Sequence, residues 1–370
     1  QHHGKQMLQK NCLESDGEVP HSWLSTPIHH GFPLLLRRQS VADVDLCAYV
    51  CHFPCLRKHT TVNISTFVRM KGLSHSFTIS LLVLTLAACD MTPAQEPAYL
   101  RVDALALADI QDEPWAGNTN SHITTTWVEV DGVNLGAFDL PMEIPVIVAD
   151  GMHEVKLYPG IDINGIAGFR GVYPFYEPLV SNILLGKGSV SNLPIGNSPY
   201  AIAYGSNCMV GVNLENFNSA GRTMVPAATS DTSWTTVSSA QLKFPPINGE
   251  PNVASGMAIL NGGIGRFEAV SNTAYSLPTG GENVYVELDY RSTLPVTIGV
   301  IANRPSGIIQ QPTATLYPKD EWSHAYINLV TEVSGFPDAY DYQIFIGTAK
   351  DSTGKIDTIL IDNMRMIYCP

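Results

Sequence analysis

After residue 100 the chain consists mainly of short runs in which hydrophobic and polar residues alternate, with Gly, Pro, Asn and Asp between the runs. In "HEVKLY" (153–158), Val155 and Leu157 alternate with more polar neighbours, as in a strand with one buried face. "NVYVELDY" (283–290) repeats this period. No stretch in this part combines a helical period with helix caps. The pattern therefore predicts an all-β fold.

One longer apolar run interrupts the chain before this region. "FTISLLVLTLAA" (77–88) is followed directly by Cys89. A membrane-spanning helix needs about 20 apolar residues, so the run is too short to cross a bilayer. Met70 and Lys71 precede it and small residues precede Cys89, which gives the three parts of a secretory signal. A buried strand or helix segment is the alternative interpretation.

The end of this run, "LAAC" (86–89), resembles the lipobox of bacterial lipoproteins. In that family the cysteine is lipidated and becomes the mature N-terminus, so the resemblance implies a lipid on Cys89. We therefore expect translation to begin at Met70. Residues 1–69 would be an upstream leader that is not native to the protein, 70–88 the signal peptide with a short helix, and 89–100 a lipid-anchored tether.

The composition of the leader differs from that of the rest of the chain. It holds seven of the 11 histidines and four of the seven cysteines, without a sustained strand or helix period. Cys47, Cys51, His52 and Cys55 are possible metal ligands, but no second ligand pair follows at the spacing of structural zinc sites. We therefore predict an irregular leader without a metal centre.

Charge narrows the possible partners. The chain has 34 acidic and 21 basic residues, a formal net charge of −13, and only five of the acids precede Cys89. Such an excess of acid argues against nucleic acid as a partner and against electrostatic docking on anionic lipid. Attachment to a membrane would come from the lipid on Cys89. Beyond that residue, Cys208 and Cys369 form an even pair, which in an exported chain predicts one disulfide.

Residues 101–185 are predicted to form a first β-sandwich. Asp131–Gly132 and Asp150–Gly151 lie between runs rich in β-branched residues, which is a strong hairpin signal. "VEVDGVNLG" (128–136) and "GMHEVKLYPG" (151–160) resemble the PEGA type of small β-sandwich. That resemblance implies a structural or adhesive role. Residues 186–204 are expected to be a linker.

Residues 205–370 are predicted to form a second sandwich, because short strands recur there at regular spacing. "ENF" (215–217), "WSHAYINL" (322–329) and "ILIDNMRMIY" (359–368) resemble the galactose-binding-like jelly roll of carbohydrate-binding modules. The whole layout is similar to uncharacterised surface lipoproteins of the Bacteroidota. These resemblances imply glycan binding, with an envelope protein as the alternative partner, and a location at the bacterial outer membrane or cell surface.

If the jelly roll binds sugar, exposed aromatic side chains are the expected contacts, because the C–H faces of sugars stack on rings. Phe336 and Tyr340 lie in "SGFPDAYDY", a stretch punctuated by Gly and Pro, and Trp322 follows an acidic segment. We predict these three residues as ligand contacts. For each of them, a role in the hydrophobic core is the competing interpretation.

The jelly-roll resemblance also implies that the first and last strands of the domain pair antiparallel. With Cys208 opposite Cys369, Glu215 then faces Asp362, which alternation places on the inward side of its strand. Two adjacent carboxylates need a proton or a cation, and structural Ca²⁺ fits such a pair. The resemblance implies a calcium ion at this place. The alternative is that Glu215 faces solvent and Asp362 makes turn or backbone hydrogen bonds.

No catalytic motif emerges from the sequence. Glu287 and Asp289, two residues apart, share one face of a predicted strand and could form a glycosidase-like carboxylate pair, but we expect that face to be solvated. The sequence has no nucleophile elbow, no metalloprotease helix motif and no Gly-rich phosphate loop in a suitable context. We therefore predict a non-enzymatic glycan-binding lipoprotein. A structural or adhesive accessory subunit of an envelope or secretion complex, and a glycan hydrolase, remain as alternatives.

Overall fold

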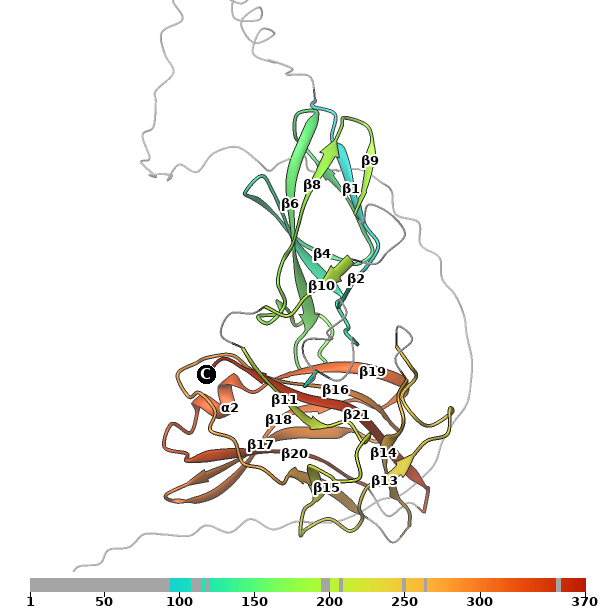
Figure 1. Cartoon of the computed structure of the whole chain (residues 1–370), viewed down its shortest axis with the longest axis vertical. Coiled ribbons are helices and arrows are strands. Elements are labelled where there is room, and N and C mark those ends of the chain that lie inside the picture. Colours follow the sequence, from blue (N-terminus) through green and yellow to red (C-terminus); the bar gives the residue numbers. More distant parts are fainter. Residues whose placement is uncertain are drawn as a thin grey trace, which may run out of the picture. The chain divides into compact units, whose positions relative to one another are not determined.

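The computed structural model describes residues 94–107, 115–116, 120–193, 200–205, 209–247, 251–262, 265–350 and 354–370 (Figure 1). These residues belong to one compact unit, Ala87–Pro370. Almost all regular elements in it are strands, and the described residues contain one helix, α2 (Val330–Ser334), so the all-β prediction is confirmed. Within the described ranges, no helix has the length and apolar character needed to cross a membrane. The predicted start at Met70 and the lipidation site at Cys89 lie outside the described residues.

The first sandwich contains three sheets. The largest has the order β4 (Val133–Asp139), β3 (Thr125–Val130), β6 (Gly151–Asp162), β7 (Arg170–Val172), with β8 (Leu179–Leu185) also paired to β6. The second has the order β5 (Met142–Val146), β1 (Ala98–Val102), β9 (Val190–Leu193), and the third joins β10 (Tyr200–Ile202) to β2 (Leu105–Leu107). Alternate aliphatic residues such as Leu100, Val128 and Leu157 are fully buried between the sheets, as the period of two predicts.

One of the two predicted hairpins forms. Asp131 and Gly132 both have positive φ, 49° and 78°, and join the paired strands β3 and β4. Asp150–Gly151 precedes β6, but β5 pairs with β1 and not with β6. The same turn signal therefore marks a change of sheet at the second position, because a turn sequence fixes the local bend and not the partner of each strand.

The boundaries of the first sandwich are wider than the sequence predicts. β9 and β10 lie in the stretch expected to be a linker, 186–204, yet they pair parallel with β1 and β2. β1 itself begins at Ala98, inside the expected tether. The chain therefore returns to the first sandwich after residue 185 before it enters the second one.

The second sandwich is formed by two larger sheets (Figure 1). The first, here called the β16 sheet, has the order β13 (Thr235–Val237), β14 (Ser255–Leu260), β21 (Asp357–Tyr368), β16 (Val284–Ser292), β19 (Lys319–Asn328), with β11 (Val210–Glu215) also on β21. The other, the β20 sheet, has the order β12 (Met224–Pro226), β15 (Arg266–Ser271), β20 (Asp341–Ala349), β17 (Val296–Arg304), β18 (Gly307–Leu316). One apolar core that includes Phe267, Val286 and Ile346 fills the space between them.

The first and last strands of this sandwich pair antiparallel, as predicted, but in another register. Val210 lies opposite Tyr368, which is one residue away from the predicted pairing. An irregularity between Asn213 and Glu215 then places Glu215 opposite Met364 instead of Asp362. The predicted register is wrong, because a one-residue slip and a bulge leave no signal in the hydrophobic pattern. Cys369 is disulfide-bonded, whereas Cys208, its predicted partner, lies outside the described residues.

The outer face of the β16 sheet is covered by the first sandwich. Tyr173, fully buried, places its ring 5.3 Å from that of Tyr285 and 4.9 Å from that of Tyr326. The backbone adds a parallel bridge between Ile163 and Tyr326. The first sandwich thus occupies part of the outer face of the β16 sheet, and the β20 sheet presents a second outer face on which a ligand could lie.

Candidate functional site

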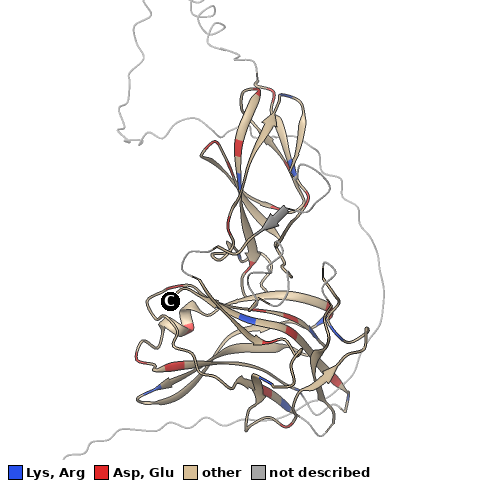
Figure 2. Ribbon diagram, viewed as in Figure 1, with Lys and Arg blue, Asp and Glu red and all other residues tan. Residues whose placement is uncertain are grey.

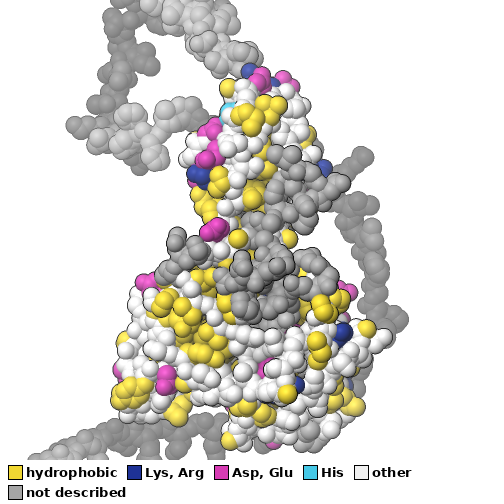
Figure 3. Space-filling view, in the orientation of Figure 1, with side chains coloured by type: hydrophobic (Ala, Val, Ile, Leu, Met, Phe, Trp, Pro, Cys, Tyr) yellow, Lys and Arg dark blue, Asp and Glu magenta, His cyan; other side chains and the backbone are white. Residues whose placement is uncertain are grey.

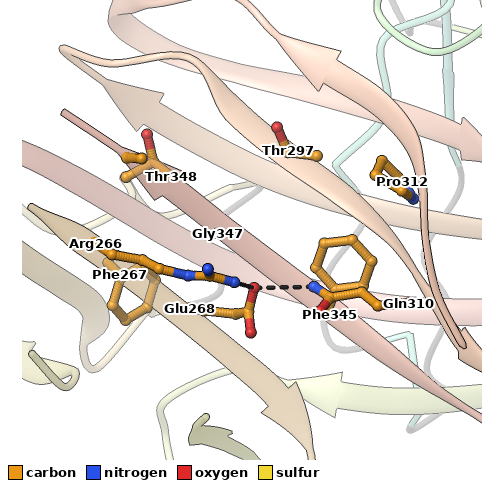
Figure 4. Close-up of a pocket in the computed structure, with 10 residues that line it drawn as sticks. Arg266, Phe267, Glu268, Thr297, Gln310, Pro312, Phe345, Gly347 and Thr348 are labelled. Atoms are coloured by element: carbon orange, nitrogen blue, oxygen red, sulfur yellow. Dashed lines mark hydrogen bonds and ion pairs between the residues drawn. The ribbon is translucent and has the colours of Figure 1, made fainter. Parts of the chain in front are cut away.

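A hollow of about 250 Å³ lies on the outer face of the β20 sheet (Figure 4). Strands β15, β17, β18 and β20 all contribute to it. Its lining consists of charged and amide side chains, small residues and two aromatic rings: Arg266, Phe267, Glu268, Thr297, Gln310, Pro312, Phe345, Gly347, Thr348 and Ala349. We call this site the Glu268 groove.

A hydrogen bond spans the groove. Gln310 Nε2 on β18 donates to Glu268 Oε2 on β15 over 2.9 Å, although β17 and β20 lie between these strands (Figure 4). Neighbouring strands are about 4.8 Å apart, so β15 and β18 would be about 14 Å apart in a flat sheet. Two side chains of this length meet more readily when the sheet curves toward them. The bond therefore indicates that this face of the sheet is concave.

One glycine, Gly347, lines the groove, and a second, Gly299, lies opposite the lining residue Phe345. A Cβ atom on Gly299 would lie 2.2 Å from Gln311 O, and one on Gly347 would lie 2.8 Å from Phe267 O. Neither position has room for a side chain, because backbone of a neighbouring strand approaches it. Phe345 lies opposite Gly299 and only 3% of it is exposed. It is on the outer face, because its neighbours Ile344 and Ile346 belong to the core.

The carboxylate of Glu268 is held by three donors. Arg266 Nη2 donates to Oε2 over 2.6 Å beside the bond from Gln310, and Thr229 Oγ1 donates to Oε1 over 3.1 Å. Burial raises the pKa of Glu268, but the bonds from Gln310, Arg266 and Thr229 outweigh burial and lower the pKa overall. The ionised carboxylate and the guanidinium cancel each other's charge. The groove therefore offers hydrogen-bond donors and acceptors without net charge.

Tyr340 and Phe336, two of the predicted contacts, lie beside the same sheet and differ in exposure. Tyr340 is 65% exposed, and its backbone N–H donates to Asn303 O at the end of β17. Phe336 is half-buried against the core, with the Arg304 guanidinium 5.2 Å from its ring centre. Figure 3 shows hydrophobic side chains (yellow) in separate patches on the visible face of this sandwich. Tyr340 is thus available to a ligand, whereas Phe336 contributes to packing.

Trp322, the third predicted contact, belongs to the other sheet. It is half-buried on β19, with the ring of Phe244 edge-on at 5.3 Å, and it lines a separate cavity. The structure does not bring Trp322 together with Phe336 and Tyr340. Glu268 was not predicted from the sequence. Its alternation with Arg266 is common to any half-exposed strand, and its partner Gln310 is far away along the chain.

Glu215 and Asp362 do not form the predicted carboxylate pair. Glu215 is buried and accepts hydrogen bonds from the backbone N–H groups of Phe217 and Thr223, at 2.9 and 2.8 Å. Asp362 is buried on the outer face of β21, where Asn252 Nδ2 donates to it over 2.6 Å. The prediction that it points into the core is wrong, because a bulge in β21 changes the alternation.

The environment of Asp362 favours its neutral form. Burial raises the pKa of this carboxyl to about 7, against the hydrogen bonds from Ser255 and Asn252. No cluster of three or more His, Cys, Asp or Glu side chains among the described residues is arranged to hold a metal ion. The structural calcium remains a prediction, but the register on which it rested is not the one observed.

Glu287 and Asp289 were expected on a solvated face, and this expectation is wrong. Both side chains are fully buried where the first sandwich covers the β16 sheet. Glu287 accepts hydrogen bonds from Tyr204 and Arg365, and Asp289 pairs with His324 Nδ1 at 2.9 Å. Figure 2 shows acidic and basic positions close together in this sheet. With every carboxylate oxygen directed to a protein donor, the cluster is a structural network.

Burial raises the pKa of Glu287, but Arg365 and His324 outweigh burial and lower it to about 2. The pKa of His324 shifts in the opposite direction. Burial lowers its pKa, and the nearby Asp289 and Glu287 carboxylates raise it overall. The Glu287 carboxylate is therefore ionised at neutral pH, and the positive charge of Arg365 balances it.

No family model matches the chain. No curated protein matches it either. Solved structures with a similar fold include a carbohydrate-binding module from the beta-sandwich superfamily, 12% identical, with a TM-score of 0.32, covering 66% of this chain and 85% of that one. A family 29 carbohydrate-binding module complexed with cellulohexaose is 15% identical, with a TM-score of 0.27, covering 44% and 93%. The enzymatically active domain of bacteriophage CBA120 tailspike protein 4 is 12% identical, with a TM-score of 0.30, covering 41% and 20%. At these identities and TM-scores, the likeness does not assign a ligand.

Proposed function

We propose that this chain is a non-enzymatic carbohydrate-binding protein, which holds a neutral glycan in the Glu268 groove. The observation that carries the proposal is the continuous polar array of Arg266, Glu268 and Gln310 in a groove whose lining includes the closely packed backbone of Gly347. A sugar hydroxyl both donates and accepts hydrogen bonds, and this array offers both functions side by side. The mutual cancellation of the two charges favours a neutral glycan over an acidic one.

The dimensions of the groove suggest how much of a glycan it holds. Its volume of about 250 Å³ is below the roughly 300–1,000 Å³ of pockets for drug-sized ligands. It therefore fits a short segment of the glycan, with sugar C–H groups against Pro312 and the backbone of Gly347. The remainder would extend over the sheet toward the end of β17, where Tyr340 offers an exposed ring for stacking.

A glycan array followed by isothermal titration with the best ligand tests this function. Glu268→Ala should weaken binding about tenfold or more, because it removes the acceptor and leaves Arg266 and Gln310 without their partner. Asp139→Ala is the matched control, since it removes an acid from an exposed arginine pair in the first sandwich, with Arg170. An array without saturable signal, or unchanged binding by Glu268→Ala, would refute the proposal. The first of these results would favour the accessory-subunit alternative.

Anchoring to the bacterial outer membrane or cell surface through a lipid on Cys89 is the second part of the proposal. It is supported by the signal pattern from Met70 to Cys89 and by the resemblance to surface lipoproteins with a PEGA-like sandwich. Intact mass of the membrane-extracted native protein should show an acylated chain beginning at Cys89. A Cys89→Ala variant should not be acylated. Recovery of peptides from residues 1–69 in the native protein would contradict the proposed start.

A further inference from the structure

A second cavity, of about 310 Å³, lies where the first sandwich meets the β16 sheet. Two separate parts of the second sandwich form most of it, Phe244–Ile247 and Trp322–His324. The third wall is the segment Asn120–His122, which precedes β3 of the first sandwich. We call this site the Trp322 pocket. It is distinct from the Glu268 groove, because none of its lining residues belongs to the β20 sheet.

Two aromatic rings form a corner of the pocket. The rings of Trp322 and Phe244 are nearly perpendicular, at 87°, and their centres are 5.3 Å apart. The Arg291 guanidinium lies 5.8 Å from the centre of the Trp322 ring and helps to fix the indole. The buried Trp322 Nε1 has no hydrogen-bond acceptor among the described residues. A buried donor without an acceptor costs free energy, which an oxygen atom of a ligand could recover.

Polar groups with balanced charge complete the walls. His324 is already paired with Asp289, and Asp289 also accepts a hydrogen bond from Asn120 Nδ2. Burial lowers the pKa of His122, with a further lowering from His324, so its imidazole is neutral at pH 7. The pocket therefore combines ring surfaces with hydroxyl, amide and imidazole groups, and it carries no uncompensated charge that would select an ion.

We propose that the Trp322 pocket is a second binding site, which takes one neutral sugar ring. A sugar ring presents a C–H face for the Trp322–Phe244 corner and hydroxyls for Asn120, Ser121 and His122. The class of ligand rests on the proposed carbohydrate function. Because both sandwiches contribute walls, the bound sugar stabilises their contact. It also contacts Asn120, whose side chain belongs to the buried network around Asp289.

The test uses the full mature chain and a panel of neutral methyl glycosides, followed by titration with the best one. We expect Trp322→Ala and His122→Ala each to weaken glycoside binding about tenfold or more. Trp322→Phe should retain part of the affinity, because it keeps a ring beside Phe244. Trp127→Phe, a change to a half-exposed tryptophan of the first sandwich, is the control and should leave the affinity unchanged. Glycoside binding that neither Trp322→Ala nor His122→Ala weakens, or no glycoside binding at all, overturns the inference.

Comparing the single variants of the two sites shows which site binds which sugar. Glu268→Ala should leave glycoside binding in the Trp322 pocket intact while it weakens the glycan identified on the array. If Glu268→Ala abolishes all sugar binding, the Trp322 pocket is refuted and the Glu268 groove stands. If Trp322→Ala abolishes all sugar binding and Glu268→Ala changes nothing, the groove is refuted and the Trp322 pocket stands. Retained folding of each variant is checked by urea unfolding, and His122→Ala leaves β19 unchanged should Trp322→Ala fail to fold.

Discussion

Glu287 and Arg365 lie opposite each other on β16 and β21, and Arg365 Nε is 2.6 Å from Glu287 Oε2 in a site where neither side chain is more than 1% exposed. The pair also joins the two sandwiches. Arg365 donates to Ala116 O and Asn120 O, at 2.6 and 2.9 Å, and Glu287 accepts from Tyr204. The buried charge is thus shared between residues far apart in the sequence.

Removing one partner of this ion pair should strongly destabilise the protein. Arg365→Met leaves the Glu287 carboxylate buried without its cation, and breaking a buried pair in this way costs about 3–5 kcal/mol. Glu143→Gln is the control, since its pair with Arg101 has a separation of 4.0 Å and both side chains are about half exposed. The control should change the free energy of unfolding by at most about 0.5 kcal/mol. Urea unfolding at pH 7 measures both, and equal effects would contradict the prediction.

The stability of the protein should also depend on pH through Asp362. Its folded pKa of about 7 lies above the ordinary value of 3.8, so the folded state holds a proton that the unfolded chain has released. The free energy of unfolding therefore falls as pH rises through this interval, and the effect is complete above about pH 7. Asp362→Asn cannot lose a proton. Between pH 5 and pH 8, wild type should lose about 3 kcal/mol more than this variant.

The difference between Asp362→Asn and wild type cancels the contributions of the other titrating groups to the pH dependence, because both proteins contain those groups. Glu287 contributes in the opposite direction and at lower pH, because its folded pKa is about 2 and its stabilisation is lost only as pH falls below about 4.5. Urea titrations at pH 5, 6, 7 and 8 would give the two curves. Parallel curves would show that Asp362 does not hold a proton in the folded state.

The alternation of residues predicted where strands lie, but it did not predict what covers them. The run that contains Glu287 and Asp289 reads as one apolar and one polar face, and the structure has a strand at 284–292. The polar face is covered by the first sandwich through Tyr173 and Tyr204. A polar face turned to water and a polar face turned to a matching polar surface have the same pattern in a single strand.

Pairing and site assembly depend on long-range contacts that local signals do not contain. The antiparallel pairing of the first and last strands was predicted, whereas the bulge that moves Glu215 opposite Met364 was not. The Glu268 groove depends on a bond from Gln310 across two intervening strands, which requires the curvature of the whole sheet. Tyr340 could be singled out, because an aromatic residue in a turn-rich segment is a local feature.

The disulfide at Cys369 gives a prediction that can be checked without a ligand. If its partner is Cys208, as the sequence predicts, a proteolytic digest under non-reducing conditions should contain two peptides joined through Cys208 and Cys369. Closing a loop of this length stabilises by about 4–5 kcal/mol in the chain-entropy model. Reductant should therefore lower the melting temperature. A free thiol at Cys208 in the oxidised mature protein would assign the bond to another partner.

Gly299, which lies opposite the lining residue Phe345, gives the sharpest test of the concave face. Gly299→Ala places a Cβ 2.2 Å from Gln311 O and 2.8 Å from Pro312 Cα, both of which are backbone atoms of β18. β18 has to move to relieve the clash, which should cost about 1–3 kcal/mol. The same movement carries Gln310 away from Glu268, so glycan affinity should fall together with stability.

Gly280→Ala provides the matched comparison for this last prediction. A Cβ at Gly280 would meet no atom within 4 Å, and its φ lies outside the left-handed region, so alanine is accommodated without strain. Its effect on the free energy of unfolding should be within about 0.5 kcal/mol, because alanine adds no clash and slightly restricts the unfolded chain. Urea midpoints at constant slope compare the two variants. If Gly299→Ala is as stable as Gly280→Ala and binds glycan as tightly as wild type, β18 is not held against Gly299, and the close packing of β17 on β18 would have to be abandoned as a support of the groove.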